Sequence, residues 1–131
     1  MGMGRVLVVD DEAVVRRSIS LLLTKAGFDV VEAEDGEKGI AAMKADGNAL
    51  LVDAIICDLY MPKVNGMEAI AYFRSQFPSV PVIVLTAKPD TYSTAAMFKQ
   101  GVMEYLIKPV ESEKLVSTVH KAAQAHVLFN D

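Results

Sequence analysis

Short apolar runs alternate along this chain with longer segments in which apolar residues recur at helical spacing. Such alternation is typical of repeated strand–helix units, in which the strands form one parallel sheet and the helices connect them. Taking each run of four to six residues as a strand places the strands near 5–9, 28–32, 53–57, 81–85 and 104–107. The pattern therefore predicts an α/β domain built on five parallel strands.

The segments between these runs carry the apolar stripe of amphipathic helices. The stripe of the first segment consists of Val15, Ile19, Leu22, Leu23 and Ala26. Gly27 follows at the position where a residue in the left-handed conformation ends a helix. Further helices are predicted near 37–46, 66–77, 90–100 and 112–126. Because strand-to-helix returns are right-handed crossovers, these helices should cover both faces of the sheet.

The last predicted helix has Ser112 as its N-cap. Its core-facing residues are Leu115, Val119 and Ala122. His120 and His126 are six residues apart rather than four, the spacing of a metal-binding pair, and we expect both at the surface. Elsewhere, the stretch 48–52 either lengthens the connection into the third strand or begins that strand early.

The composition fits one soluble, cytoplasmic domain. The chain has 131 residues, 52% of them hydrophobic and 23% charged, which suffices for a single core. A net charge of −4 and a pI near 5.1 argue against a nucleic-acid surface. The one cysteine, Cys57, should be a small core residue in a reducing compartment. No apolar stretch approaches the ~20 residues that cross a bilayer, so no membrane contact is expected.

Polar residues stand at the ends of four predicted strands. Asp10 and Asp11 follow the first strand, Asp58 follows the third, Thr86 closes the fourth and Lys108 follows the fifth. The carboxyl ends of parallel strands share one edge of the sheet, which is where open α/β sheets bind ligands. We therefore expect these five residues to gather at one site.

The predicted site combines carboxylates with a cation and a hydroxyl. Three carboxylates within about 5 Å repel one another by roughly 3 kcal/mol per pair at an effective dielectric near 20, so a cation must offset them. Mg²⁺ suits such oxygen ligands, and zinc is disfavoured because no His or Cys is expected nearby. Lys108 adds positive charge that can hold a phosphoryl oxygen, and Thr86 adds a hydroxyl donor. Adjacent strand residues point to opposite faces, so one of Asp10 and Asp11 should face the pocket while the other caps the next helix or holds a metal-bound water.

Five motifs resemble those of the receiver domain of two-component response regulators. They are Val8-Val9-Asp10-Asp11-Glu12, Ile56-Cys57-Asp58-Leu59-Tyr60-Met61-Pro62, Asn65-Gly66, Leu85-Thr86-Ala87 and Tyr105-Leu106-Ile107-Lys108-Pro109. They occur in order, at family-like spacing, over essentially the whole chain. The resemblance implies a flavodoxin-like (βα)5 fold of three layers, with a five-stranded parallel sheet of order 2-1-3-4-5. We place the receiver domain at 5–127, between a disordered start or cloning remnant at 1–4 and a tail or linker start at 128–131.

The resemblance also implies a role for each site residue. Asp58 would be the phosphoacceptor. Asp11 would bind Mg²⁺ directly, together with Asp58 and the backbone carbonyl of Tyr60, while Asp10 would act mainly through a bound water. The phosphoryl oxygens would be held by Thr86 and Lys108, and the rotamer switch would be Tyr105. The Lys108–Pro109 bond is often cis in similar domains.

The predicted function is a phosphoacceptor signalling switch of a two-component phosphorelay. Asp58 would take a phosphoryl group from a phosphohistidine in a Mg²⁺-dependent reaction and lose it slowly by autodephosphorylation, so the chain would not be an enzyme with an external substrate. Its partner would be a sensor histidine kinase or a histidine phosphotransfer protein. An effector domain or output protein would use the face formed by the predicted helix 90–100, strand 104–107 and helix 112–126, without direct contact to nucleic acid.

Three other functions are compatible with parts of the pattern. A docking module of the same fold that works without phosphorylation is the main alternative. An aspartyl-phosphate phosphatase would need an acid–base carboxylate two residues after its nucleophile, where this chain has Tyr60, and the chain has no room for a cap domain. Flavin binding would need a Ser/Thr/Gly-rich loop after the first strand, where Asp10-Asp11-Glu12 would repel the flavin phosphate.

Overall fold

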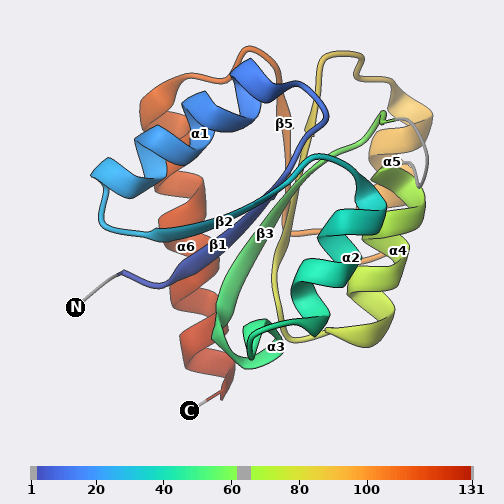
Figure 1. Ribbon diagram of the computed structural model, residues 1–131. Helices are drawn as coiled ribbons and strands as arrows, with labels where there is room; N and C mark the ends of the chain where they lie inside the picture. Colours follow the sequence, from blue (N-terminus) through green and yellow to red (C-terminus); the bar gives the residue numbers. More distant parts are fainter. Residues whose placement is uncertain (1–2, 62–65, 131) are drawn as a thin grey trace.

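The computed structural model describes residues 3–61 and 66–130, and it contains one sheet of five parallel strands in the order β2-β1-β3-β4-β5 (Figure 1). The strands are β1 (Arg5–Val9), β2 (Asp29–Ala33), β3 (Val52–Asp58), β4 (Val82–Thr86) and β5 (Glu104–Ile107). The helices are α1 (Ala13–Lys25), α2 (Gly36–Lys44), α3 (Asn48–Leu51), α4 (Gly66–Gln76), α5 (Thr91–Lys99) and α6 (Ser112–Asn130). This arrangement confirms the predicted flavodoxin-like fold and its strand order.

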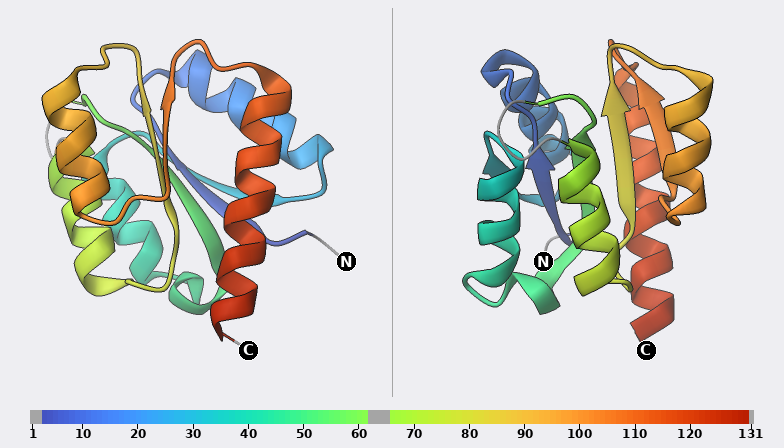
Figure 2. Two further views of the ribbon diagram at one scale, coloured as in Figure 1. Left: turned by 180° about the vertical axis from the view of Figure 1, so that it is seen from behind. Right: turned by 90° about the vertical axis from the view of Figure 1, so that its right-hand side faces the viewer.

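Helices cover both faces of the sheet (Figure 2). The strand side chains alternate between these faces: Val6 and Val8 of β1 pack under α1 and α6, whereas Leu7 and Val9 pack under α2, α4 and α5. We call the two clusters the α1/α6 core and the α2/α4/α5 core. Cys57 is fully buried in the second, as predicted, and its burial raises the pKa of the thiol.

Most element boundaries differ slightly from the predicted ranges, and two of them bear on specific predictions. Residues 48–51 form a helical turn, α3, which lengthens the connection, and β3 begins at Val52. The last helix begins at Ser112 itself, and its first backbone bond runs from the Leu115 N–H to the Glu111 carbonyl. Ser112 as N-cap was therefore wrong, because the cap position belongs to Glu111.

The expected surface location of His126 was also wrong. His126 is only 7% exposed, and its Nδ1 lies 2.9 Å from Asp53 Oδ1. His120 is half-buried, and its ring packs edge-on against Phe28 with 5.2 Å between centroids. Both histidines of α6 therefore contact the body of the domain.

The parallel register brings the strand ends together. Val9 is level with Cys57, Asp58 with Leu85, and Thr86 with Ile107. The residues that follow β1, β3, β4 and β5 consequently meet at one edge. Pro62 and Asn65 of the receiver-like motifs lie outside the described residues. None of the helices in the described part of the chain is long and apolar enough to cross a membrane.

Candidate functional site

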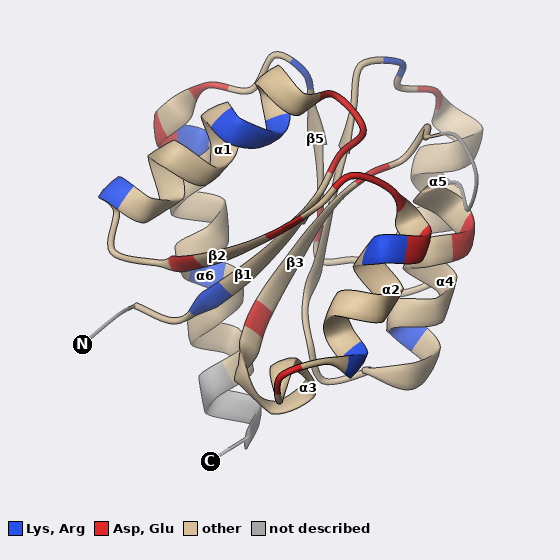
Figure 3. Cartoon of the chain, in the orientation of Figure 1, with Lys and Arg blue, Asp and Glu red and all other residues tan. Residues whose placement is uncertain are grey.

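Four carboxylates converge at the carboxyl edge of the sheet. Asp10, Asp11, Glu12 and Asp58 each place an oxygen within 4.8 Å of the others. Figure 3 shows the acidic stretch in the loop that follows β1. Asp10 and Asp58 are 1% and 4% exposed, while Asp11 and Glu12 face solvent. Hard oxygen donors at this spacing, with an open side toward water, fit a hydrated Mg²⁺ ion.

Asp10 is held rigidly from three sides. Its Oδ1 accepts a hydrogen bond of 2.9 Å from the Glu12 N–H, its own N–H donates to the Ala33 carbonyl, and its carbonyl accepts from Arg16 Nη1 at 2.7 Å. The carboxylate therefore shapes the turn before α1, whose N-cap residue makes no side-chain cap bond. Asp11 is exposed, so the two neighbours are placed differently, as the strand geometry predicts.

Lys108 lies among these carboxylates. Its Nζ is 2.8 Å from Asp10 Oδ2, 3.0 Å from Glu12 Oε1 and 3.0 Å from Asp58 Oδ2. The Lys108 N–H donates to the Thr86 carbonyl, and the Lys108–Pro109 bond is cis. Sequence reasoning included Glu12 in a motif but gave it no role; its position directly after two aspartates was the available signal.

The cluster shifts the protonation equilibria of its members. Burial raises the pKa of the Asp58 carboxyl, and the Lys108 ammonium opposes part of that rise. Burial alone would lower the pKa of Lys108, but hydrogen bonds to Asp10, Glu12 and Asp58 outweigh it and raise the pKa above the ordinary lysine value. Lys108 is therefore a permanent cation beside an unusually basic carboxylate.

Three further predicted residues surround this cluster. Thr86 is fully buried, and its Oγ1 accepts a 3.1 Å bond from the Lys88 N–H. The Tyr60 N–H donates to Asp58 Oδ1 at 3.2 Å, which sets the Tyr60 backbone against the carboxylate. Tyr105 is half-buried in the α2/α4/α5 core, and its hydroxyl contacts Ser93 of α5 rather than the carboxylates.

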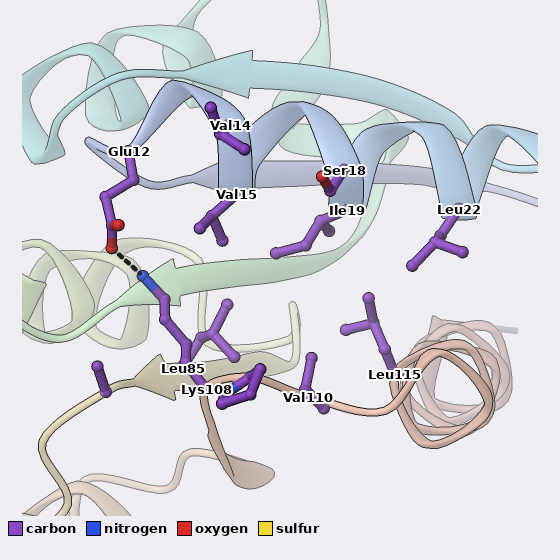
Figure 4. Close-up of a pocket in the computed structure, with 12 residues that line it drawn as sticks. Glu12, Val14, Val15, Ser18, Ile19, Leu22, Leu85, Lys108, Val110 and Leu115 are labelled. Carbon is purple, nitrogen blue, oxygen red and sulfur yellow. Dashed lines mark hydrogen bonds and ion pairs between the residues drawn. The ribbon is translucent and has the colours of Figure 1, made fainter.

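A largely apolar groove of about 430 Å³ opens beside Lys108, between α1 and the segment joining β5 to α6 (Figure 4). Val15, Ile19 and Leu22 line it from α1, and Val110 and Leu115 line it from the opposite side. Glu12 and Lys108 meet at its end nearest the carboxylates. Val14 on its rim is 80% exposed. The groove thus leads from an apolar surface to the charged site.

The fold and site together define a doubly wound α/β domain with a cluster of carboxylates at the strand ends. The family model of the response regulator receiver domain matches residues 6–120. The chain belongs to this family, whose members are signalling proteins of two-component systems. Response regulators pair with histidine kinases and with effector domains.

Curated relatives extend beyond the region that matches. The chain is 34% identical over 121 residues to the transcriptional regulatory protein GlrR of Escherichia coli, which is 92% of this chain and 26% of GlrR. It is 34% identical over 117 residues to the response regulator ArlR of Staphylococcus aureus, which is 89% of this chain and 51% of ArlR. The chain thus spans about a quarter to half of these relatives' lengths.

Solved structures show the same architecture. A receiver domain protein from Clostridium thermocellum has a TM-score of 0.89 at 30% identity, with 96% of this chain and 98% of that chain covered. The chemotaxis protein CheY4 of Vibrio cholerae has a TM-score of 0.82 at 30% identity, with 92% and 99% covered.

Proposed function

We propose that this domain is a phosphorylation switch in which Asp58 accepts a phosphoryl group from a phosphohistidine. The observation that carries the proposal is the 3.0 Å contact between Lys108 Nζ and Asp58 Oδ2 within a buried acidic cluster. The same ammonium also contacts Asp10 and Glu12, and it can offset the negative charge that a phosphoryl group on Asp58 would add. The receiver-domain membership of the chain supports the same choice.

The transfer needs few chemical groups. An Asp58 carboxylate oxygen attacks phosphorus in line, the P–N bond breaks, and its electron pair leaves with the histidine nitrogen. The product is an aspartyl phosphate, which water can hydrolyse to aspartate and inorganic phosphate. Lys108 and the Thr86 hydroxyl would bind the phosphoryl oxygens, so the protein contributes position and charge.

A magnesium ion fits the oxygen donors of the site. Asp11, Asp58 and the backbone carbonyl of Tyr60 would hold it, and Asp10 would act through a bound water. The ion would supply positive charge to the phosphoryl oxygens during transfer. Two observations favour the water-mediated role for Asp10: it is buried, and its Oδ1 already accepts a hydrogen bond from the Glu12 N–H.

The phosphodonor would dock along the apolar groove. Val14 on α1 and Pro109 after β5 flank the path to Asp58, with Ile19 on the groove floor. A helix of a histidine kinase or histidine phosphotransfer protein that presents its phosphohistidine beside apolar side chains would fill such a groove. Lys108 at the groove end would meet the incoming phosphoryl group first.

The response would pass from Thr86 to Tyr105 and then to the face formed by α5, β5 and α6. Phosphorylation must favour the active conformer by a few kcal/mol to reverse a mostly inactive population. Exposed side chains of that face include Tyr92, Phe98 and Ile107. An effector domain or output protein would read this face, with residues 5–127 acting as the cytoplasmic receiver unit.

Intact mass after incubation with acetyl phosphate tests the proposal. Wild type should gain about 80 Da in the presence of Mg²⁺ and none without it, the mass of one phosphoryl group. Asp58→Asn should gain nothing, while the control Asp29→Asn, altered at an exposed aspartate of β2, should behave like wild type. An adduct that survives Asp58→Asn would identify another acceptor. No adduct on any form would indicate a docking module that works without phosphorylation.

A further inference from the structure

Asp90 joins two loops on the α5 side of the site. It is the N-cap of α5, where its Oδ1 accepts a 2.7 Å bond from the Ser93 N–H. Its Oδ2 accepts from the Ser93 hydroxyl at 2.8 Å and from the Tyr60 hydroxyl at 3.0 Å. Tyr60 lies two residues after Asp58, so one carboxylate contacts both the loop beyond β3 and the first turn of α5.

The contact continues from Ser93 into β5. The Ser93 Oγ lies 3.4 Å from the Tyr105 hydroxyl. Ser93 is 3% exposed, so its hydroxyl depends on protein partners rather than on water. Tyr60, Asp90, Ser93 and Tyr105 thus form a continuous chain of polar contacts, which we call the Tyr60–Tyr105 relay.

The direction of each hydrogen bond in the relay is fixed by chemistry. The Asp90 carboxylate is the acceptor for the Ser93 N–H, the Ser93 hydroxyl and the Tyr60 hydroxyl, and a carboxylate can only accept. Both hydroxyls must therefore donate to it. Ser93 has then used its one hydroxyl hydrogen, so Tyr105 must be the donor to Ser93 Oγ. Loss of the Tyr60 hydroxyl therefore changes the hydrogen bond between Asp90 and the Ser93 hydroxyl. Through it, the Ser93 Oγ that accepts from Tyr105 is also affected.

We propose that this relay couples the loop carrying Tyr60 to the side chain of Tyr105, as a second route beside the one through Thr86. Asp90 and Ser93 act as positioning residues in it. The Tyr60 N–H contacts Asp58 directly, so a group added to Asp58 displaces the same residue whose hydroxyl begins the relay. The Thr86 Oγ1 is bonded instead to the Lys88 N–H. The coupling to phosphorylation rests on the proposed function, whereas the relay itself does not.

Nuclear magnetic resonance of the unphosphorylated protein tests the relay directly. Tyr60→Phe removes only one hydroxyl and keeps the ring. We expect it to shift the Ser93 amide resonance and the ring resonances of Tyr105, which lies in a different strand. Tyr92→Phe is the matched control, because Tyr92 lies on α5 beside Ser93 but is 83% exposed. This substitution should leave the Tyr105 resonances unchanged. Shifts from Tyr60→Phe that are confined to the neighbours of residue 60 would overturn the relay.

A second comparison tests the route independent of Thr86. In Thr86→Ala, acetyl phosphate with Mg²⁺ should still shift the Tyr105 resonances, and adding Tyr60→Phe should abolish that residual shift. A Tyr105 that does not respond in phosphorylated Thr86→Ala would overturn the second route. If wild type takes up no phosphoryl group, the proposed function fails, and the unphosphorylated spectra alone decide whether the relay exists.

Discussion

His126 Nδ1 lies 2.9 Å from Asp53 Oδ1, and this contact joins α6 to the amino end of β3. The other oxygen of Asp53 accepts a 3.0 Å bond from the Arg5 N–H, so one carboxylate holds β1, β3 and α6 together. Gly4 precedes this point with φ +130°, and a Cβ there would come within 2.4 Å of Asp53 Oδ2. The end of the sheet opposite the candidate site is therefore closed by a specific polar contact.

Replacing His126 should loosen that end of the domain. His126→Ala removes a buried hydrogen bond and leaves an oxygen of Asp53 without this donor, so we expect a loss of about 1–2 kcal/mol in the free energy of unfolding. Urea denaturation measures the change. Lys121→Ala, at an exposed position of the same helix, should leave the midpoint unaltered. An unchanged midpoint for His126→Ala would show that the contact contributes nothing.

Removing Lys108 should destabilise the domain, because the carboxylates that its ammonium contacts would then repel one another. Lys108→Met leaves the buried Asp10 without its cation, and breaking such a buried pair costs about 3 kcal/mol. Thermal unfolding without divalent ions should show a clear drop in Tm, and added Mg²⁺ should restore more of it than it adds to wild type. Lys88→Met serves as the control, because Lys88 is exposed. A Mg²⁺ effect no larger than that in wild type would contradict this picture.

Neutralising Asp58 should stabilise the folded domain at neutral pH. The folded state raises the pKa of Asp58, so charged Asp58 is less favourable in the folded than in the unfolded chain. In the absence of Mg²⁺, Asp58→Asn should therefore be more stable than wild type at pH 7. The gain should shrink as pH falls through the raised pKa and vanish below about 3.9, where the aspartate is protonated in both states. Denaturation curves across pH would refute this if the difference stayed constant or grew toward acid.

Tyr60 should influence how long a phosphoryl group survives. Its side chain is 44% exposed and is bonded to Asp90 across the loops that flank Asp58. Tyr60→Ala opens this side to water, so we expect the aspartyl phosphate to hydrolyse several-fold faster. Decay of the phosphorylated mass after removal of acetyl phosphate measures the rate. Equal decay in Tyr60→Ala and wild type would mean that the ring does not screen the site.

The sheet and the meeting of its strand ends could be predicted because they depend on patterns that repeat in every strand–helix unit. Asp10, Asp58 and Lys108 follow buried strands, and parallel pairing places them at one edge. The strand order itself came from the family resemblance, since apolar periodicity does not say which strands are neighbours. The side-chain partners of Lys108 depend on rotamers, which periodicity does not encode.

The misplacement of His126 has a different cause. It follows Leu115, Val119 and Ala122 at the next helical repeat, so the spacing placed it on the buried stripe. A histidine can occupy such a buried position when a polar group such as Asp53 meets its ring nitrogen, and apolar periodicity does not encode that partner. The helical turn at 48–51 could not be predicted from apolar periodicity, because four residues are too few to define a helical stripe.

The sheet separates the two compartments of the molecule, the α1/α6 core on one face and the α2/α4/α5 core on the other. The floor of the groove, with Ile19 and Leu115, belongs to the α1/α6 core, whereas Tyr105 belongs to the α2/α4/α5 core. In the proposed function, the surface that receives the phosphodonor and the surface around α5 therefore lie over different cores. The strand ends that carry Asp58, Thr86 and Lys108 lie at the edge where the two compartments meet. Substitutions under one core can thus alter the proposed donor surface while the packing under the proposed output face is kept.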